Sequence, residues 1–164
     1  MAVDICDREG LFVPGLTAET RIYLEKITPA EAGSSVRNPV EIGIGAAGVS
    51  TDYAKGLEIV ASDPQVDFII THLNPEGYIH YGDLGPWRSV LKNMLLKSAK
   101  TISKPLIVVI MPGQTSETFG PIKDLCCELI RDGLPVFTSV QAAVRTVRKV
   151  IEYYEFLSNA QGCD

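Results

Sequence analysis

The chain of 164 residues lacks the features that mark several classes of protein. Its longest apolar runs, such as Leu106–Met111, fall far short of the roughly 20 residues that span a bilayer. It has no block of Lys and Arg, and 15 basic residues against 20 acidic ones leave a net charge of −5. The sequence from Met1 onward begins with neither the basic segment nor the apolar core of a secretion signal. We therefore expect a cytoplasmic protein with no membrane and no nucleic-acid partner.

Residues that bind metals or form disulfides are equally scarce. The four cysteines are Cys6, Cys126, Cys127 and Cys163. They contain no Cys-x-x-Cys pair, so we expect reduced thiols rather than a zinc site or a disulfide framework. The two histidines, His72 and His80, have no Ser, Asp or Cys partner recognisable by spacing, which favours structural roles over catalysis. The sequence therefore assigns neither a metal site nor a catalytic residue.

The remaining composition is that of one ordinary globular domain over residues 1–164. Apolar residues make up 46% and charged residues 21%, and a chain of this length buries roughly 70% of its unfolded surface. Apolar runs that predict strands occur at Leu11–Val13, Val40–Ile42, Val66–Leu73, Pro105–Met111 and Leu134–Thr138. Helices are predicted after Thr17, after Ser50 or Thr51, over Trp87–Ile102, over Phe119–Arg131 and after Ser139.

The run Pro105–Met111 indicates how these elements are arranged. It has almost no polar residue, which is typical of a parallel strand covered by helices on both faces. Together with the alternation of strands and helices, it predicts an α/β fold with a doubly wound, mainly parallel sheet. Val3–Glu9 has the character of a helix end, with Gly10 as its stop. Because a helix of such a domain follows a strand, we expect the sheet to lack its first strand and the N-terminal βα unit to be incomplete.

A glycine-rich segment, Gly43–Gly48, matches the pattern G-x-G-x-x-G of dinucleotide-binding domains. Its context disagrees with that function, because the preceding strand is only three residues long and the helix cap lies beyond the last glycine. The acidic candidate, Asp67, also precedes its strand instead of ending it. We therefore interpret the segment as a loop at the carboxyl edge of the sheet rather than as the site of a nicotinamide cofactor.

Two further segments, Asn74–Gly77 and Met111–Gln114, follow the predicted strands Val66–Leu73 and Pro105–Met111, which we expect to be buried and parallel. Ligands of open α/β sheets bind outside the carboxyl ends of the strands, so these segments are candidate binding loops. The alternative is that their Gly and Pro residues merely end the strands.

Several short motifs, in order, resemble one family along nearly the whole chain, from about Val3 to Phe156. They are Gly10–Leu11, Leu16–Thr20, Asn38–Ala46, Gly56–Asp67, Lys104–Val109 and Gly133–Phe137. This order and spacing resemble the carboxy-terminal flavodoxin-like domain of nucleoside-diphosphate-forming acyl-CoA synthetases, and the related succinyl-CoA synthetases.

The resemblance implies a function that needs other domains. Such enzymes convert acyl-CoA, phosphate and a nucleoside diphosphate into acid, CoA and the triphosphate through a phosphohistidine. The expected partners are CoA-binding, phosphohistidine and ATP-grasp domains or subunits, and association of the chain with itself stays open. CoA, the nucleotide and Mg²⁺ are expected in the complete enzyme, with no cofactor bound by this chain alone. His72 and His80 do not lie in the family's phosphohistidine motif, so that role is not assigned to them.

The resemblance also suggests which residues face the site between domains. They are Asn38, Pro39, Glu41, Gly43, Gly45, Gly48, Asn74, Gly77, Met111, Gly113 and Gln114. The chain departs from succinyl-CoA synthetases where these carry an arginine, since Ile110 or Met111 stands there. This departure predicts a monocarboxylic or apolar acyl group rather than a dicarboxylate. The alternative function is a stand-alone, non-catalytic binding or regulatory module with the same fold.

Overall fold

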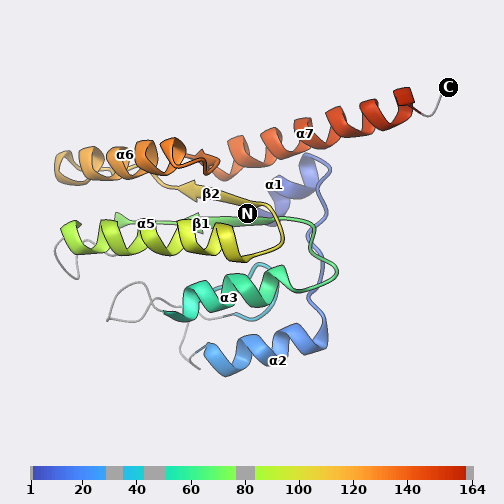
Figure 1. Cartoon of the computed structure of the whole chain (residues 1–164), viewed down its shortest axis with the longest axis horizontal. Helices are drawn as coiled ribbons and strands as arrows, with labels where there is room; N and C mark the ends of the chain where they lie inside the picture. Colours follow the sequence, from blue (N-terminus) through green and yellow to red (C-terminus); the bar gives the residue numbers. More distant parts are fainter. Residues whose placement is uncertain (1, 29–34, 43–50, 77–83, 162–164) are drawn as a thin grey trace.

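A computed structural model describes residues 2–28, 35–42, 51–76 and 84–161 of the chain. These residues form a parallel three-stranded sheet with helices on both faces (Figure 1). The strands, in spatial order, are β1 (Ile69–Leu73), β2 (Leu106–Ile110) and β3 (Val136–Phe137). The predicted α/β class and the parallel, flavodoxin-like arrangement are thereby confirmed. No helix in the described ranges is both long enough and apolar enough to cross a membrane.

The central strand, β2, is buried along its whole length, as its apolar sequence predicts. Val108 and Val109 are both fully buried, although successive side chains of a strand point to opposite faces. Val108 lies in the larger of two apolar clusters and Val109 in the smaller one. Both faces of the sheet are therefore covered by helices.

The helices are α1 (Ala2–Arg8), α2 (Ala18–Ile27), α3 (Thr51–Ala61), α5 (Leu84–Thr101), α6 (Ser116–Arg131) and α7 (Val140–Gln161). Several of their ends have recognisable capping chemistry. Thr17 caps α2, as predicted, by accepting a hydrogen bond from the Thr20 N–H. The helix α6 begins before the predicted Phe119, because Thr115 and Thr118 form a reciprocal capping box. Gly10 and Gly133 follow α1 and α6 with positive φ angles of 73° and 92°, a region that glycine enters without steric cost.

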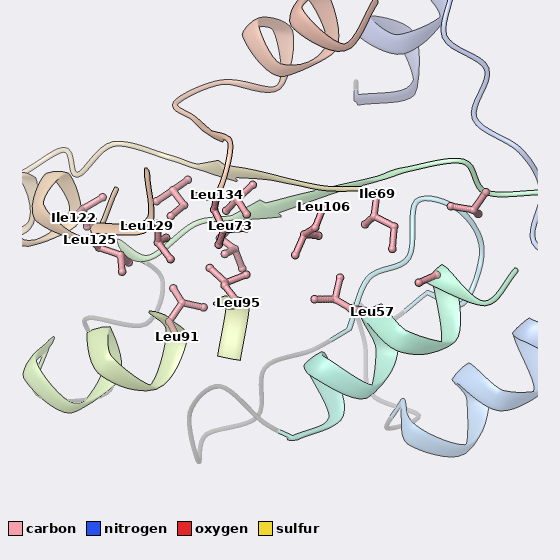
Figure 2. Packing of buried hydrophobic residues seen from close by; sticks show 14 of the residues in the cluster. Leu57, Ile69, Leu73, Leu91, Leu95, Leu106, Ile122, Leu125, Leu129 and Leu134 are labelled. Carbon is pink, nitrogen blue, oxygen red and sulfur yellow. The ribbon is translucent and has the colours of Figure 1, made fainter. Parts of the chain in front are cut away.

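The larger cluster, called here the leucine core, lies between one face of the sheet and α2, α3, α5 and α6. Figure 2 shows its labelled side chains converging from β1, β2, α3, α5 and α6. Leu91, Leu95, Leu125 and Leu129 are fully buried in it. Trp87, at the start of α5, packs against the same cluster. Most of the buried apolar surface therefore lies on this first face.

The second face carries a much smaller cluster, which we call the α7 cluster and which consists of Ile107, Val109 and Ala143. The helix α7 supplies Ala143, and α1 packs against α7. The outer half of α7 runs past the sheet (Figure 1) and exposes Tyr154 and Phe156 by 63% and 67%. The apolar residues at helical spacing along α7, from Val140 to Tyr154, therefore pack against the sheet only in the first half of the helix.

Two predicted strands are wrong. Residues Leu11–Val13 form no strand, and Val40–Ile42 contributes only one bridge, in which Ser35 and Glu41 pair. Local β propensity does not suffice at either place, because a strand needs a hydrogen-bonded neighbour along its length. Leu11 is nevertheless buried and Phe12 is 86% exposed, so the first segment keeps the alternation of a strand.

Candidate functional site

The carboxyl ends of β1 and β2 lie side by side, as parallel pairing requires. The Met111 N–H donates a hydrogen bond to the Leu73 carbonyl oxygen at 3.0 Å. The residues that follow the two strands, Asn74 and Met111, are therefore brought to the same edge of the sheet. Asn74 is exposed and Met111 is half-buried.

Glu76 connects the two chain segments that leave this edge. Its Oε1 atom accepts a hydrogen bond from the Gln114 backbone N–H at 2.7 Å. The same atom accepts a second hydrogen bond from the Thr118 hydroxyl at 2.6 Å. One half-buried carboxylate therefore fixes the turn after β2, and the first turn of α6, against the end of β1.

Gly113 allows this turn to lie tightly against α6. A Cβ atom at position 113 would lie 2.5 Å from the Thr118 carbonyl carbon and 2.6 Å from the Phe119 nitrogen. Real Cβ atoms do not approach backbone so closely, so any other residue would push the turn away from the helix. Glycine at this position is required by packing, which goes beyond its predicted function of ending a strand.

The chemistry of this edge is that of a shaped polar surface. Asn74 and Gln114 are exposed and offer amide donors and acceptors, while the Gln114 N–H is already used by Glu76. Within the described ranges, no group of His, Cys, Asp and Glu residues is placed to hold a metal ion. The edge is therefore suited to contacting and orienting a ligand or a neighbouring domain.

A second group of predicted site residues, Asn38, Pro39 and Glu41, lies in a different part of the molecule. The Asn38 side-chain amide donates a hydrogen bond to the Pro14 carbonyl oxygen at 3.0 Å. The backbone of Glu41 pairs with that of Ser35. The structure thus ties this segment to the chain that leads into α2, and not to the edge formed by Asn74 and Gln114.

Asp63, a buried carboxylate located just before β1, anchors the start of α2. Its Oδ2 atom accepts hydrogen bonds from the Thr17 N–H at 2.8 Å and the Thr17 hydroxyl at 3.0 Å, and its Oδ1 atom accepts one from the Gln65 N–H at 2.9 Å. Burial raises the pKa of this carboxyl, but hydrogen bonds from Thr20, Gln65 and Thr17 outweigh that effect and hold the pKa below its ordinary value of 3.8. Asp63 is therefore an ionised structural anchor, although the sequence indicates it only as part of the motif Gly56–Asp67.

Several other predicted residues are placed as follows. Gly43, Gly45, Gly48, Gly77 and His80 lie outside the described residues. His72 is an exposed residue of β1. Burial raises the pKa of the Cys6 thiol, and burial together with the neighbouring Cys127 raises that of Cys126, so these two thiols are poor nucleophiles.

Ile110 and Met111, the two residues expected where succinyl-CoA synthetases carry an arginine, differ in burial. Ile110 is fully buried in the leucine core, whereas Met111 is half-buried at the end of β2. Of the two, Met111 is therefore the residue whose side chain can reach a ligand at the carboxyl edge.

Sequence reasoning missed Glu76 as the residue that organises this edge. The sequence predicts Asn74–Gly77 as a binding loop but assigns no function to the carboxylate at its third position. The signal that predicts it is an acid shortly after one strand, combined with a Gly-containing turn and a Thr-capped helix after the next strand. That combination supplies an acceptor and two donors at one edge of a parallel sheet.

Comparisons with known proteins give one informative match. No family model matches the chain, and no solved structure matches it. Over 154 residues the chain is 27% identical to the ADP-forming acetate–CoA ligase I of Archaeoglobus fulgidus. The match covers 93% of this chain but only 19% of that ligase, so the chain spans about a fifth of the relative's length. The chain is thus similar, at low identity and along nearly all of its length, to one part of a much larger ligase.

Proposed function

We propose that the chain is a domain or subunit of a nucleoside-diphosphate-forming acyl-CoA synthetase. The reaction of the whole enzyme would be acyl-CoA + NDP + phosphate = acid + CoA + NTP. The observation that carries this proposal is the similarity of 93% of the chain to part of an ADP-forming acetate–CoA ligase. The parallel α/β fold and the order of the sequence motifs support the same assignment.

In this proposal the chain contributes shape and contacts, while the chemical step takes place on partner domains. Asn74, Met111, Gly113 and Gln114 would form part of the wall of a site between domains. Partner domains or subunits would bind CoA, carry the phosphorylated histidine and hold the nucleotide with Mg²⁺ in an ATP-grasp fold. The rigid connection through Glu76 supports such a role, because a wall residue must keep its position when a partner docks.

The acyl group that we propose is monocarboxylic or apolar. Met111 is the half-buried residue at the end of β2 and offers a thioether surface instead of a charged fork. The second carboxylate of a dicarboxylic acyl group would find no guanidinium partner at Met111. The enzyme assembled with its partners should therefore use acetyl-CoA or a longer monoacyl-CoA at least ten times more efficiently than succinyl-CoA, a factor equivalent to about 1.4 kcal/mol.

The test is acyl-CoA-dependent formation of ATP or GTP from the diphosphate and phosphate. It is measured for this chain alone, for the product of the neighbouring gene alone, and for the two mixed. Activity that appears only on mixing supports the proposal. If neither the components nor the mixture forms triphosphate, the chain is better explained as a stand-alone binding or regulatory module.

Variants of the mixture locate the site. Gln114→Ala should lower the acyl-CoA-dependent rate, whereas Gln65→Ala, which removes another exposed amide before β1, should leave the rate unchanged. If the two substitutions changed the rate equally, the carboxyl edge would not be part of the proposed site.

A further inference from the structure

Phe119 is a large apolar side chain that the fold leaves uncovered. It lies in the first turn of α6 and is 54% exposed. The residues with which α6 covers the leucine core, Ile122, Leu125 and Leu129, are buried. The ring of Phe119 therefore adds little to the packing of the fold, and contact with another molecule would remove its apolar surface from water.

The tight turn after β2 places Phe119 beside the carboxyl edge. A Cβ atom at Gly113 would lie 2.6 Å from the Phe119 nitrogen, so the chain at Gly113 runs directly past the first turn of α6. Side chains of a helix lean toward its N-terminus, and the N-terminus of α6 lies at this edge. Glu76 fixes the same turn through two hydrogen bonds. Phe119 therefore stands next to the loop that begins at Met111.

The surface around Phe119 leaves room for a ligand. The next residue, Gly120, has no side chain, and a Cβ atom placed there would meet nothing within 4 Å in the described part of the chain. Met111 is half-buried and offers a thioether, which packs favourably with aromatic rings. Asn74 and Gln114 add amide groups at the same edge. An apolar surface with a few polar groups is the usual composition of a site that binds a small molecule.

We propose that Phe119 is a specificity-determining residue, whose ring and the Met111 thioether form the apolar wall that contacts the acyl group. This inference rests on the proposed function, because it names the part of the substrate that meets the carboxyl edge. The face of the ring is larger than the single methyl group of an acetyl group can cover. The acyl group that fits this wall is therefore an apolar chain of several carbon atoms, which covers both side chains and excludes water from them.

The preference is measured as triphosphate formation by the chain mixed with the product of the neighbouring gene. Hexanoyl-CoA and acetyl-CoA are compared as substrates. Phe119→Ala should lower kcat/KM for hexanoyl-CoA about tenfold, mainly through a higher KM, because the ring contacts the acyl chain equally in the ground state and in the transition state. The value for acetyl-CoA should change less than about twofold.

Two further variants separate a specific contact from a general loss of apolar surface. Ile130→Ala removes a side chain that is 55% exposed in the last turn of the same helix, and it should leave both values unchanged. Phe119→Leu keeps an apolar side chain and should restore most of the hexanoyl-CoA value. If Phe119→Ala lowers both values equally or changes neither, Phe119 does not set the specificity, while the activity of the mixture still supports the proposed function.

A second measurement does not depend on turnover. The three methionines, Met1, Met94 and Met111, each give one methyl signal in a chain labelled with ¹³C at these groups. Phe119→Ala should shift the Met111 signal, because the nearby ring is lost, and should leave unchanged that of Met94, which packs against the leucine core. Hexanoate added to the mixture should shift the Met111 signal in the wild-type chain and not in Phe119→Ala.

The two measurements distinguish failure of this inference from failure of the proposed function. If the mixture forms no triphosphate but hexanoate shifts the Met111 signal only when Phe119 is present, the proposed function is wrong and the apolar wall is supported. If hexanoate leaves the Met111 signal of the wild-type chain unchanged, the wall is overturned whatever the activity of the mixture.

Discussion

The two faces of the sheet differ in how they are covered. The first face carries the leucine core, together with the buried hydrogen bonds of Asp63 and those of Glu76 to the start of α6. The second face carries the small α7 cluster, and Glu9, directly after α1, forms an ion pair with Arg145 of α7. The difference teaches that the apolar packing is concentrated on one face of the sheet, while a much smaller cluster covers the other face.

The largest expected difference between the faces comes from two adjacent valines of β2. Val108→Ala should lower the free energy of unfolding by about 2.5 kcal/mol, because it opens a cavity in the leucine core. Val109→Ala removes the same atoms from an equally buried position but should cost about 1 kcal/mol less. Its neighbours on α7, Val140 and Val147, are only partly buried and can relax into the space. Urea unfolding measures both values, and equal losses would contradict the asymmetry of the two faces.

The next largest effect on stability is expected at the tight turn that contains Gly113. Gly113→Ala should destabilise the protein by about 2 kcal/mol, since the added Cβ atom meets the backbone of α6. The matched control is Gly15→Ala, where an added Cβ atom meets nothing within 4 Å and the change should be neutral or slightly stabilising. Thermal unfolding of the two variants gives the comparison. A neutral Gly113→Ala would show that the turn moves freely.

Asp63 provides a pH-dependent contribution on the first face. Asp63→Asn should cost about 1.5 kcal/mol at pH 7, because an amide has one oxygen and must present its NH₂ to a donor at Thr17 or Gln65. Since the folded pKa lies below its ordinary value of 3.8, the wild-type contribution is present above pH 4 and is lost as the pH falls through the folded pKa. The gap between wild type and variant should therefore narrow below pH 4. A gap that stays constant down to pH 2 would contradict a lowered pKa for Asp63 in the folded protein.

Glu76 should have a smaller effect on stability. Glu76→Ala removes the acceptor for Gln114 and Thr118 and should cost about 1 kcal/mol, while amide exchange at Gln114 becomes faster. Glu76→Gln keeps one side-chain oxygen as an acceptor and should restore most of the protection. If both variants exchange like wild type at Gln114, the carboxylate does not hold the turn.

The smallest effect is expected on the second face. Glu9 forms an ion pair with Arg145 at 2.8 Å, and the Arg145 side chain is 62% exposed. Glu9→Gln should change the free energy of unfolding by less than about 0.5 kcal/mol, since solvent and salt screen such pairs. A loss comparable to that of Asp63→Asn would show that α1 contributes far more to the fold than the comparison of the two faces implies.

Much of the fold was predictable because it depends on local chemistry. The unbroken apolar run of β2, the Thr17 cap and the Gly10 stop were each read from a few neighbouring residues, and the structure agrees with all three. The predicted strand at Leu11–Val13 was wrong because pairing depends on a neighbour that local sequence does not reveal.

The candidate site was less predictable, for a related reason. The ends of the predicted strands indicated Asn74 and Gln114 as candidate site residues. The contact of Glu76 with Gln114, however, joins residues 38 positions apart. The close approach of Gly113 to α6 likewise depends on the path of the helix rather than on the turn itself. Such contacts arise from tertiary packing, which no short motif encodes.

The position of the single tryptophan gives the two faces separate optical signals. Trp87 packs against the leucine core, whereas Tyr153 and Tyr154 form an edge-on ring pair on the exposed half of α7. Indole fluorescence therefore reports on the first face, and the near-ultraviolet dichroism of the tyrosine pair reports on the outer half of α7. If the outer half of α7 unfolds while the leucine core stays intact, the two signals should show transitions at different temperatures, in a chain that needs no added label.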